Sequence, residues 1–200
     1  MKKPVIVGLN KDTYRWLCAE KSIYKPADET WFKTSYPIFS SGKSPHTKDD
    51  FYRVIAFAYS WMPTIPNVKQ IGNKQWREIK RLLPKIARNP EPLRKLLVIL
   101  IPIINNSLVG TSKVLHFISP EQVPIIDSRV LANWNRIFKQ NKELTLKKTL
   151  LLDSNKTRQI KNYLKYRDML IEWQSKCGRK VTIRKLEELL YYQKIRIAKK

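Results

Sequence analysis

The chain has 200 residues, the size of one domain or of one domain in two lobes. Its 40 Lys and Arg residues against 16 Asp and Glu residues give a formal net charge of +24. This balance argues against an ordinary neutral metabolic enzyme and favours a polyanionic partner, above all nucleic acid. A disordered basic arm is also excluded, because 42% of the residues are hydrophobic and six are Trp, enough to build a core.

Helical periodicity dominates the chain, and we expect an all-α protein. Thr47 is a good N-cap, and Asp49 and Asp50 fall in the first turn behind it, where they complement the helix dipole. Pro63 ends that helix, and Pro102 ends or kinks the most apolar segment of the chain. The expected helices cover residues 12–21, 48–62, 74–83, 93–104, 111–118, 128–138, 155–176 and 182–199.

Residues 93–138 form one organised unit: an apolar helix, a tight turn over 105–110, a short helix and an extended stretch that leads into another helix. A glycine-containing hairpin before a helix N-terminus points backbone N–H groups at solvent, and they suit a DNA phosphate. Asp127 begins the next helix, and it faces the same neighbourhood if the short helix folds back. The carboxylate would then lie beside a sugar whose phosphate the hairpin holds.

This segment resembles the helix-hairpin-helix DNA glycosylase superfamily, the kinship of endonuclease III, adenine glycosylase and 8-oxoguanine glycosylase. The family's L-P-G-V-G-[RT]-[KS] hairpin corresponds to Ser107-Leu108-Val109-Gly110-Thr111-Ser112, and its P-x-x-D-x-x-[VI] stretch to Pro124-Ile125-Ile126-Asp127-Ser128-Arg129-Val130. Leu108 replaces the first hairpin glycine, the gap to Asp127 is a few residues shorter, and the cluster-binding cysteines of some members are absent. The resemblance implies a two-lobed helical domain, with its helix-hairpin-helix unit at about 93–138 and a basic C-terminal region at about 155–200.

The resemblance also implies roles for single residues. Asp127 takes the position of the catalytic aspartate, whose carboxylate stabilises the positive charge that develops on the deoxyribose. The family's Schiff-base lysine falls on Ser112 by strict alignment, with Lys113 adjacent. A lysine there attacks the sugar and can lead on to strand cleavage, whereas with serine there the enzyme uses water. Both assignments remain open at this point.

Each of these residues also has a structural interpretation. Asp127 is an ideal N-cap in any helical protein, and Gly110 can simply supply a left-handed turn residue. Lys113 is equally suited to a surface position or a phosphate contact, and Arg129 to a phosphate or surface contact. His116 stands among Val114, Leu115 and Phe117, which favours a hydrogen-bonded core histidine over a general base.

We therefore expect a DNA glycosylase that acts as a monomer on double-stranded DNA, flips one base out and hydrolyses its N-glycosidic bond. The substrate is a damaged base in repair or a modified base in foreign phage DNA. The expected DNA contacts are Leu108, Val109, Gly110, Thr111 and Ser112 of the hairpin, then Arg129, Lys161 and Lys165. The alternative is a non-catalytic DNA- or RNA-binding protein that uses the same basic helices; a nuclease is less favoured, because no carboxylate cluster with metal-ligand spacing is visible.

Cofactors and location follow from composition. Two distant cysteines, Cys18 and Cys177, and two histidines provide neither a zinc site nor a four-cysteine cluster, so we expect no cofactor and no metal. The longest apolar run, residues 96–104, is too short for a bilayer that needs about 20 residues. We expect a cytoplasmic, nucleoid-associated protein without membrane contact.

Overall fold

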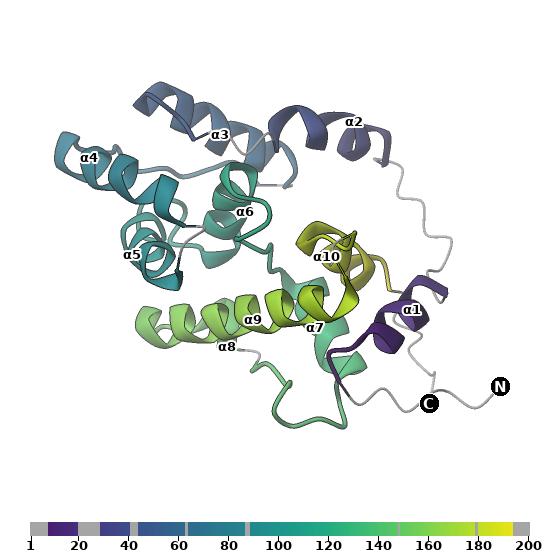
Figure 1. Cartoon of the computed structure of the whole chain (residues 1–200). Coiled ribbons are helices and arrows are strands. Elements are labelled where there is room, and N and C mark those ends of the chain that lie inside the picture. The colour runs from purple at the N-terminus through teal and green to yellow at the C-terminus, as the bar shows by residue number, and fades with distance from the viewer. Residues whose placement is uncertain are drawn as a thin grey trace.

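The computed structural model describes residues 8–19, 29–40, 44–62, 64–86, 89–147, 149–178 and 180–193 (Figure 1). These residues form helices and no strand, and the only extended pairing among them is an isolated antiparallel bridge between Val68 and Ile104. The all-α prediction is therefore confirmed for the described part of the chain. The helices are α1 (Lys11–Ala19), α2 (Glu29–Phe39), α3 (Lys48–Ser60), α4 (Asn73–Leu82) with the 3-10 turn η1 (Leu83–Lys85), α5 (Pro90–Leu100), α6 (Leu108–Ile118), α7 (Ser128–Ile137), α8 (Thr149–Leu152), α9 (Lys156–Cys177) and α10 (Ile183–Tyr192).

The helices fall into two groups that share one continuous apolar core (Figure 1). Helices α2 to α6 occupy the top and the left of the view, and α1 and α7 to α10 lie at the bottom and the right, with α8 and the start of α9 at the lower left. The long helix α9 packs against α5 of the first group and against α1 and α10 of the second. Its Tyr163, Tyr166 and Trp173 side chains are fully buried. Among the described residues, no helix is long and apolar enough to cross a membrane.

Helix starts agree with the polar residues that precede them. The Thr47 side chain accepts a hydrogen bond from the Asp50 backbone N–H (3.1 Å), and the Asp50 carboxylate accepts one from the Thr47 N–H (3.0 Å). This reciprocal capping box satisfies two of the backbone donors that every helix start leaves without an intrahelical acceptor. The predicted Thr47 cap is confirmed, and Asp50 closes the box in addition to complementing the helix dipole.

Helix α2 was not predicted from the sequence, because Pro37 lies inside it and the surrounding stretch is broken by Pro26 and Gly42. Two other predicted helices extend beyond the described residues: positions 20–21 of the first and 194–199 of the last. The apolar segment ends its helix at Leu100, two residues before Pro102.

The predicted glycine hairpin is wrong in its position. The turn ends at Ser107, so α6 begins at Leu108, three residues earlier than the sequence suggested. The left-handed residues are Asn105 (φ 53°) and Asn106 (φ 50°), and asparagine tolerates this conformation better than most residues. The Asn105 side chain also accepts a hydrogen bond from the Asn67 N–H, which ties the turn to the segment between α3 and α4.

Gly110 lies in the first turn of α6, where its N–H donates to the Ser107 hydroxyl (3.1 Å). A Cβ atom at this position would lie 2.4 Å from the Tyr59 hydroxyl oxygen and 3.2 Å from the ring carbon that bears it. Glycine is therefore required by the close approach of α3 to α6, and not by a left-handed backbone.

We expect Gly110→Ala to destabilise the protein by up to about 2 kcal/mol, because overpacking costs about 1–3 kcal/mol and the better helix propensity of alanine offsets about 1 kcal/mol of that. In the double variant Gly110→Ala/Tyr59→Phe the hydroxyl oxygen is gone, so the loss is smaller than the sum of the two single losses. Urea unfolding of the four proteins measures this coupling. Additive losses would contradict the contact.

Candidate functional site

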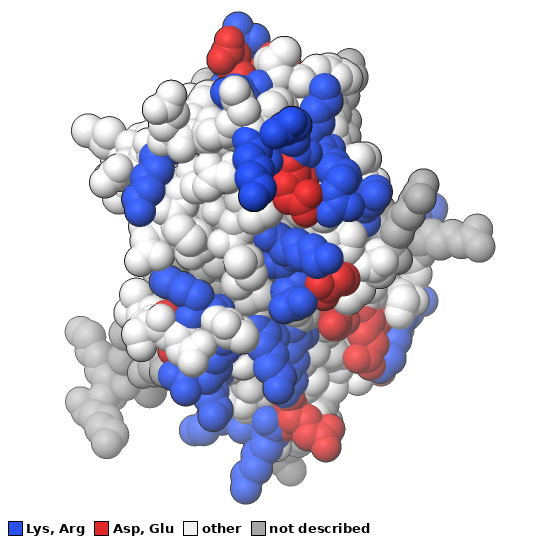
Figure 2. Space-filling model, turned by 90° about the vertical axis from the view of Figure 1, so that its left-hand side faces the viewer, with Lys and Arg blue, Asp and Glu red and all other residues white. Residues whose placement is uncertain are grey.

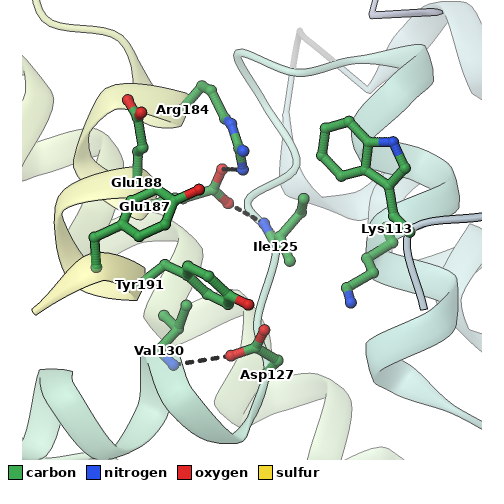
Figure 3. A pocket seen from close by; sticks show the side chains of 10 residues that line it. Lys113, Ile125, Asp127, Val130, Arg184, Glu187, Glu188 and Tyr191 are labelled. Carbon is green, nitrogen blue, oxygen red and sulfur yellow. Dashed lines mark hydrogen bonds and ion pairs between the residues drawn. The ribbon is translucent and has the colours of Figure 1, made fainter. Parts of the chain in front are cut away.

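A pocket opens where the two groups of helices meet (Figure 3). Trp61 and Lys113 come from the first group, at the end of α3 and on α6. The other lining residues belong to the segment before α7, to α7 itself and to α10. The full lining consists of Trp61, Lys113, Ile125, Asp127, Val130, Arg184, Glu187, Glu188, Tyr191 and Tyr192.

Asp127 is both a helix cap and a pocket residue. Its Oδ1 accepts a hydrogen bond from the Val130 backbone N–H (2.9 Å), which makes it the N-cap of α7. In Figure 3 its other carboxylate oxygen is turned toward the space beside Tyr191. The capping interpretation and the functional interpretation of Asp127 are therefore compatible, because each uses a different oxygen.

Lys113 extends from α6 into the same pocket, and its amine faces the side on which Asp127 and Tyr191 lie (Figure 3). Burial of the side chain lowers the pKa of the Lys113 amine; the nearby Asp127 opposes this shift, and the positive charge of Arg184 adds to it. Ser112 is fully buried, and its hydroxyl donates to the Val109 carbonyl (2.9 Å). Of the two residues at the expected lysine position, only Lys113 lines the pocket.

The side chains of the expected hairpin do not form a contact surface. Leu108, Gly110, Thr111 and Ser112 are buried, and the Thr111 hydroxyl donates to the Ser107 carbonyl (2.7 Å). Val109 alone is partly exposed. Four of these side chains therefore build the start of α6 and its packing against the core, and contact between this segment and DNA stays a prediction that rests on its backbone N–H groups.

The three basic residues expected at DNA lie in two places. Arg129 is exposed, and its guanidinium carbon lies 4.5 Å from the centre of the ring of Tyr191, which lines the pocket. Lys161 and Lys165 line a separate groove between α5 and α9, opposite Arg94. Figure 2 shows the face on the α4 and α5 side, where Lys and Arg side chains follow one another in a broken band with Asp and Glu between them. The structure thus brings Arg129 to the pocket and keeps Lys161 and Lys165 away from it.

His116 is a fully buried, hydrogen-bonded residue, as the sequence suggested. Burial, assisted by the charge of Arg184, lowers the pKa of its imidazole to about 3. The neutral ring lies 2.7 Å from the Val123 carbonyl through Nδ1 and 2.9 Å from the Tyr36 hydroxyl through Nε2. Because a carbonyl can only accept, Nδ1 carries the proton and donates to it, and Nε2 accepts from Tyr36.

Glu187 is the pocket residue that sequence reasoning missed. Its Oε1 accepts a hydrogen bond from the Ile125 backbone N–H, and its Oε2 has no hydrogen-bond partner among the described residues. Burial raises the pKa of this carboxyl to about 8; Arg184 opposes the shift, and Asp127 adds to it. One signal was present in the sequence: Glu187 stands four residues after Ile183 and three before Leu190, on the apolar face of α10.

Comparison with known proteins adds no relative. No family model matches the chain, and no curated protein and no solved structure matches it either. Within the described residues, no group of three or more His, Cys, Asp or Glu side chains is arranged to hold a metal ion. The functional argument therefore rests on the pocket itself.

The two buried titratable residues predict how stability depends on pH. Between pH 4.5 and 6.5, Glu187 is protonated in the folded state but ionised in the unfolded state, whereas His116 is neutral in the folded state but protonated in the unfolded state. Their effects on the free energy of unfolding therefore oppose each other. Between pH 6.5 and 8 only Glu187 contributes, and the folded state binds more protons than the unfolded state. The free energy of unfolding should therefore fall by about 2 kcal/mol over this interval.

Glu187→Gln should remove this decline, because the amide oxygen can still accept from Ile125 while nothing titrates. Urea unfolding of both proteins at pH 6.5 and 8 measures the difference. An equal decline in the variant would show that another group is responsible.

Proposed function

We propose that this protein is a DNA glycosylase of the helix-hairpin-helix type, which takes one nucleotide out of duplex DNA and breaks its N-glycosidic bond. The observation that carries the proposal is that Asp127 and Lys113, named from the sequence for this chemistry, come from different helices and line one pocket. Aromatic side chains of Trp61, Tyr191 and Tyr192 line it as well, and they suit the flat face of an extruded base.

The chemistry follows from the residues in the pocket. As the bond between the base and C1′ of the sugar breaks, positive charge develops on the sugar, and a carboxylate beside it stabilises that charge. Asp127 is fixed at the start of α7 by its hydrogen bond to Val130, so little reorganisation is needed when the charge appears. Water, or the Lys113 amine, then bonds to C1′ while the base leaves with the bonding electron pair.

Overall charge supports a nucleic-acid substrate. A chain of formal charge +24 attracts phosphate backbones, and each phosphate contact makes the affinity more dependent on salt. Arg129, whose guanidinium lies over Tyr191 of the pocket, is placed to hold a phosphate next to the extruded nucleotide. The groove with Lys161 and Lys165 lies apart from the pocket, and it favours the alternative function, a non-catalytic DNA- or RNA-binding protein.

The decisive experiment is single-turnover base release in EDTA, on duplexes that carry uracil, oxidised purines, alkylated bases or bulky modified cytosines. Asp127→Asn should lower the rate by about 10²- to 10³-fold, because the charge on the sugar loses its carboxylate. DNA affinity should stay nearly unchanged, since asparagine still caps α7 through its amide oxygen.

Asp127→Ser is the matched control, because serine also caps the helix but carries no carboxylate. It should fold like Asp127→Asn and be equally inactive. Wild-type turnover in either variant would remove Asp127 from the mechanism. Salt-sensitive binding without release from any duplex would favour the non-catalytic alternative, and strand cleavage that EDTA abolishes would favour a metal-dependent nuclease.

The role of Lys113 has a separate test. If its amine attacks C1′, borohydride reduces the resulting imine to a stable protein–DNA adduct, and strands are cleaved without alkali. Lys113→Gln should lose the adduct, and so should Lys113→Arg, which keeps the positive charge but has no comparable nucleophile. An adduct of undiminished yield in Lys113→Gln would exclude Lys113. Release that leaves strands intact until alkali is added would assign the attack to water.

A further inference from the structure

One buried oxygen in the pocket has two basic neighbours at ion-pair distance but no hydrogen-bond partner among the described residues. The Glu187 side chain is 2% exposed, and its Oε2 makes no hydrogen bond within the described part of the chain. An unpaired buried polar atom costs about 1–3 kcal/mol, so native structures seldom keep one without a purpose. Because Glu187 lines the same pocket as Asp127, this oxygen is placed to meet a bound molecule (Figure 3).

The two nearest polar neighbours do not satisfy it. The His116 Nδ1 lies 3.9 Å away, and its proton is already donated to the Val123 carbonyl. The Arg184 Nη1 is also 3.9 Å away, and the guanidinium lies over the Tyr36 and Trp61 rings at 4.8 and 5.7 Å from their centres. Both distances are too long for a hydrogen bond.

The hydrogen-bond pattern defines what Oε2 can offer. Oε1 accepts from the Ile125 N–H, so in the protonated acid the hydroxyl is Oε2, and it can only be satisfied by an acceptor. Burial raises the pKa of Glu187 to about 8, so the protonated form prevails at neutral pH.

Other groups around Glu187 influence its protonation. The charged groups that face it are Arg184 and Glu188 of α10, Lys113 of α6, and Glu121 and Asp127 of the segment between α6 and α7. The uncharged titratable groups are His116 of α6, Tyr36 of α2, and Tyr163 and Tyr166 of α9. The pKa values of these three tyrosines are raised by burial, and that of His116 is lowered, so all four stay neutral near pH 7.

We propose that Glu187 selects the base: its Oε2 hydroxyl donates a hydrogen bond to the exocyclic carbonyl oxygen of an oxo-substituted base. This inference rests on the proposed function, in which the N-glycosidic bond of the selected base is then broken. Bases with a carbonyl at that edge, such as uracil, hypoxanthine and guanine, are accepted. Bases with an amino group there, such as cytosine and adenine, meet the hydroxyl with a second donor and leave both groups unpaired.

The test measures the binding of free bases to the full chain by saturation-transfer NMR. Two matched pairs are compared: hypoxanthine with adenine, and uracil with cytosine. The oxo base of each pair should bind about tenfold more tightly. Glu187→Leu should remove that preference, because it weakens the binding of the oxo base and leaves the binding of the amino base unchanged. Glu187→Gln should keep it, because the amide accepts from Ile125 and donates from the second position.

The pH profile separates this role from a merely structural one. In the wild type the preference should fade as pH rises through about 8, and in Glu187→Gln it should persist. Glu172→Gln is the control, since this exposed carboxylate pairs with Lys176 at the surface and should change nothing. Urea unfolding of each variant confirms that it is folded.

Any of three results in the wild type and in Glu187→Gln would overturn the inference: preference for the amino bases, loss of preference in Glu187→Gln, or absence of binding by any base. A preference untouched by Glu187→Leu would do so as well. The readout needs no bond cleavage, so it is independent of the glycosylase proposal. Glu187-dependent binding in a protein that releases no base from any duplex would leave this inference standing and count against the glycosylase alone.

Discussion

The site depends on how the extended stretch before α7 obtains its hydrogen bonds. A buried strand without a neighbouring strand has no backbone partners, and each unsatisfied group would be costly. Here side chains from three helices supply them. The hydrogen bonds run from the Tyr163 hydroxyl to the Pro124 carbonyl (2.7 Å), from the Tyr166 hydroxyl to the Ile125 carbonyl (3.1 Å), from Arg167 Nε to the Gln122 carbonyl (2.8 Å), from His116 Nδ1 to the Val123 carbonyl (2.7 Å), and from the Ile125 N–H to Glu187.

These hydrogen bonds fix the stretch that leads to Asp127, in addition to the hydrogen bond from the Val130 N–H by which Asp127 caps α7. Tyr163 and Tyr166 are fully buried on α9, and burial raises their pKa values well above the usual range, so both hydroxyls remain donors. Helices α6, α9 and α10 therefore all converge on the residues that lead to the carboxylate. A substitution deep in α9 can displace Asp127 without touching the pocket, because Tyr163 and Tyr166 hold the carbonyl groups of Pro124 and Ile125 just before it.

Features set by neighbouring residues in the chain could be predicted from the sequence, and features set by distant ones could not. The caps Thr47 and Asp127 were identified correctly, because an N-cap bonds only to the turn that follows it. Gly110 was misassigned because its purpose is to leave room for Tyr59, 51 residues earlier. Glu187 was missed for the same reason, since the atom that it binds belongs to Ile125.

The charges of the pocket differ in kind from those of the surface. A formal charge of +24 favours polyanions at the surface, and a pocket of the same character would hold phosphate and oppose a cationic sugar. Instead two acidic residues, Asp127 and Glu188, and two basic residues, Lys113 and Arg184, line the pocket, with Glu187 neutral among them. Under the proposed function, this contrast lets the basic surface hold the strand by its backbone while the pocket receives an uncharged base and positive charge develops beside Asp127.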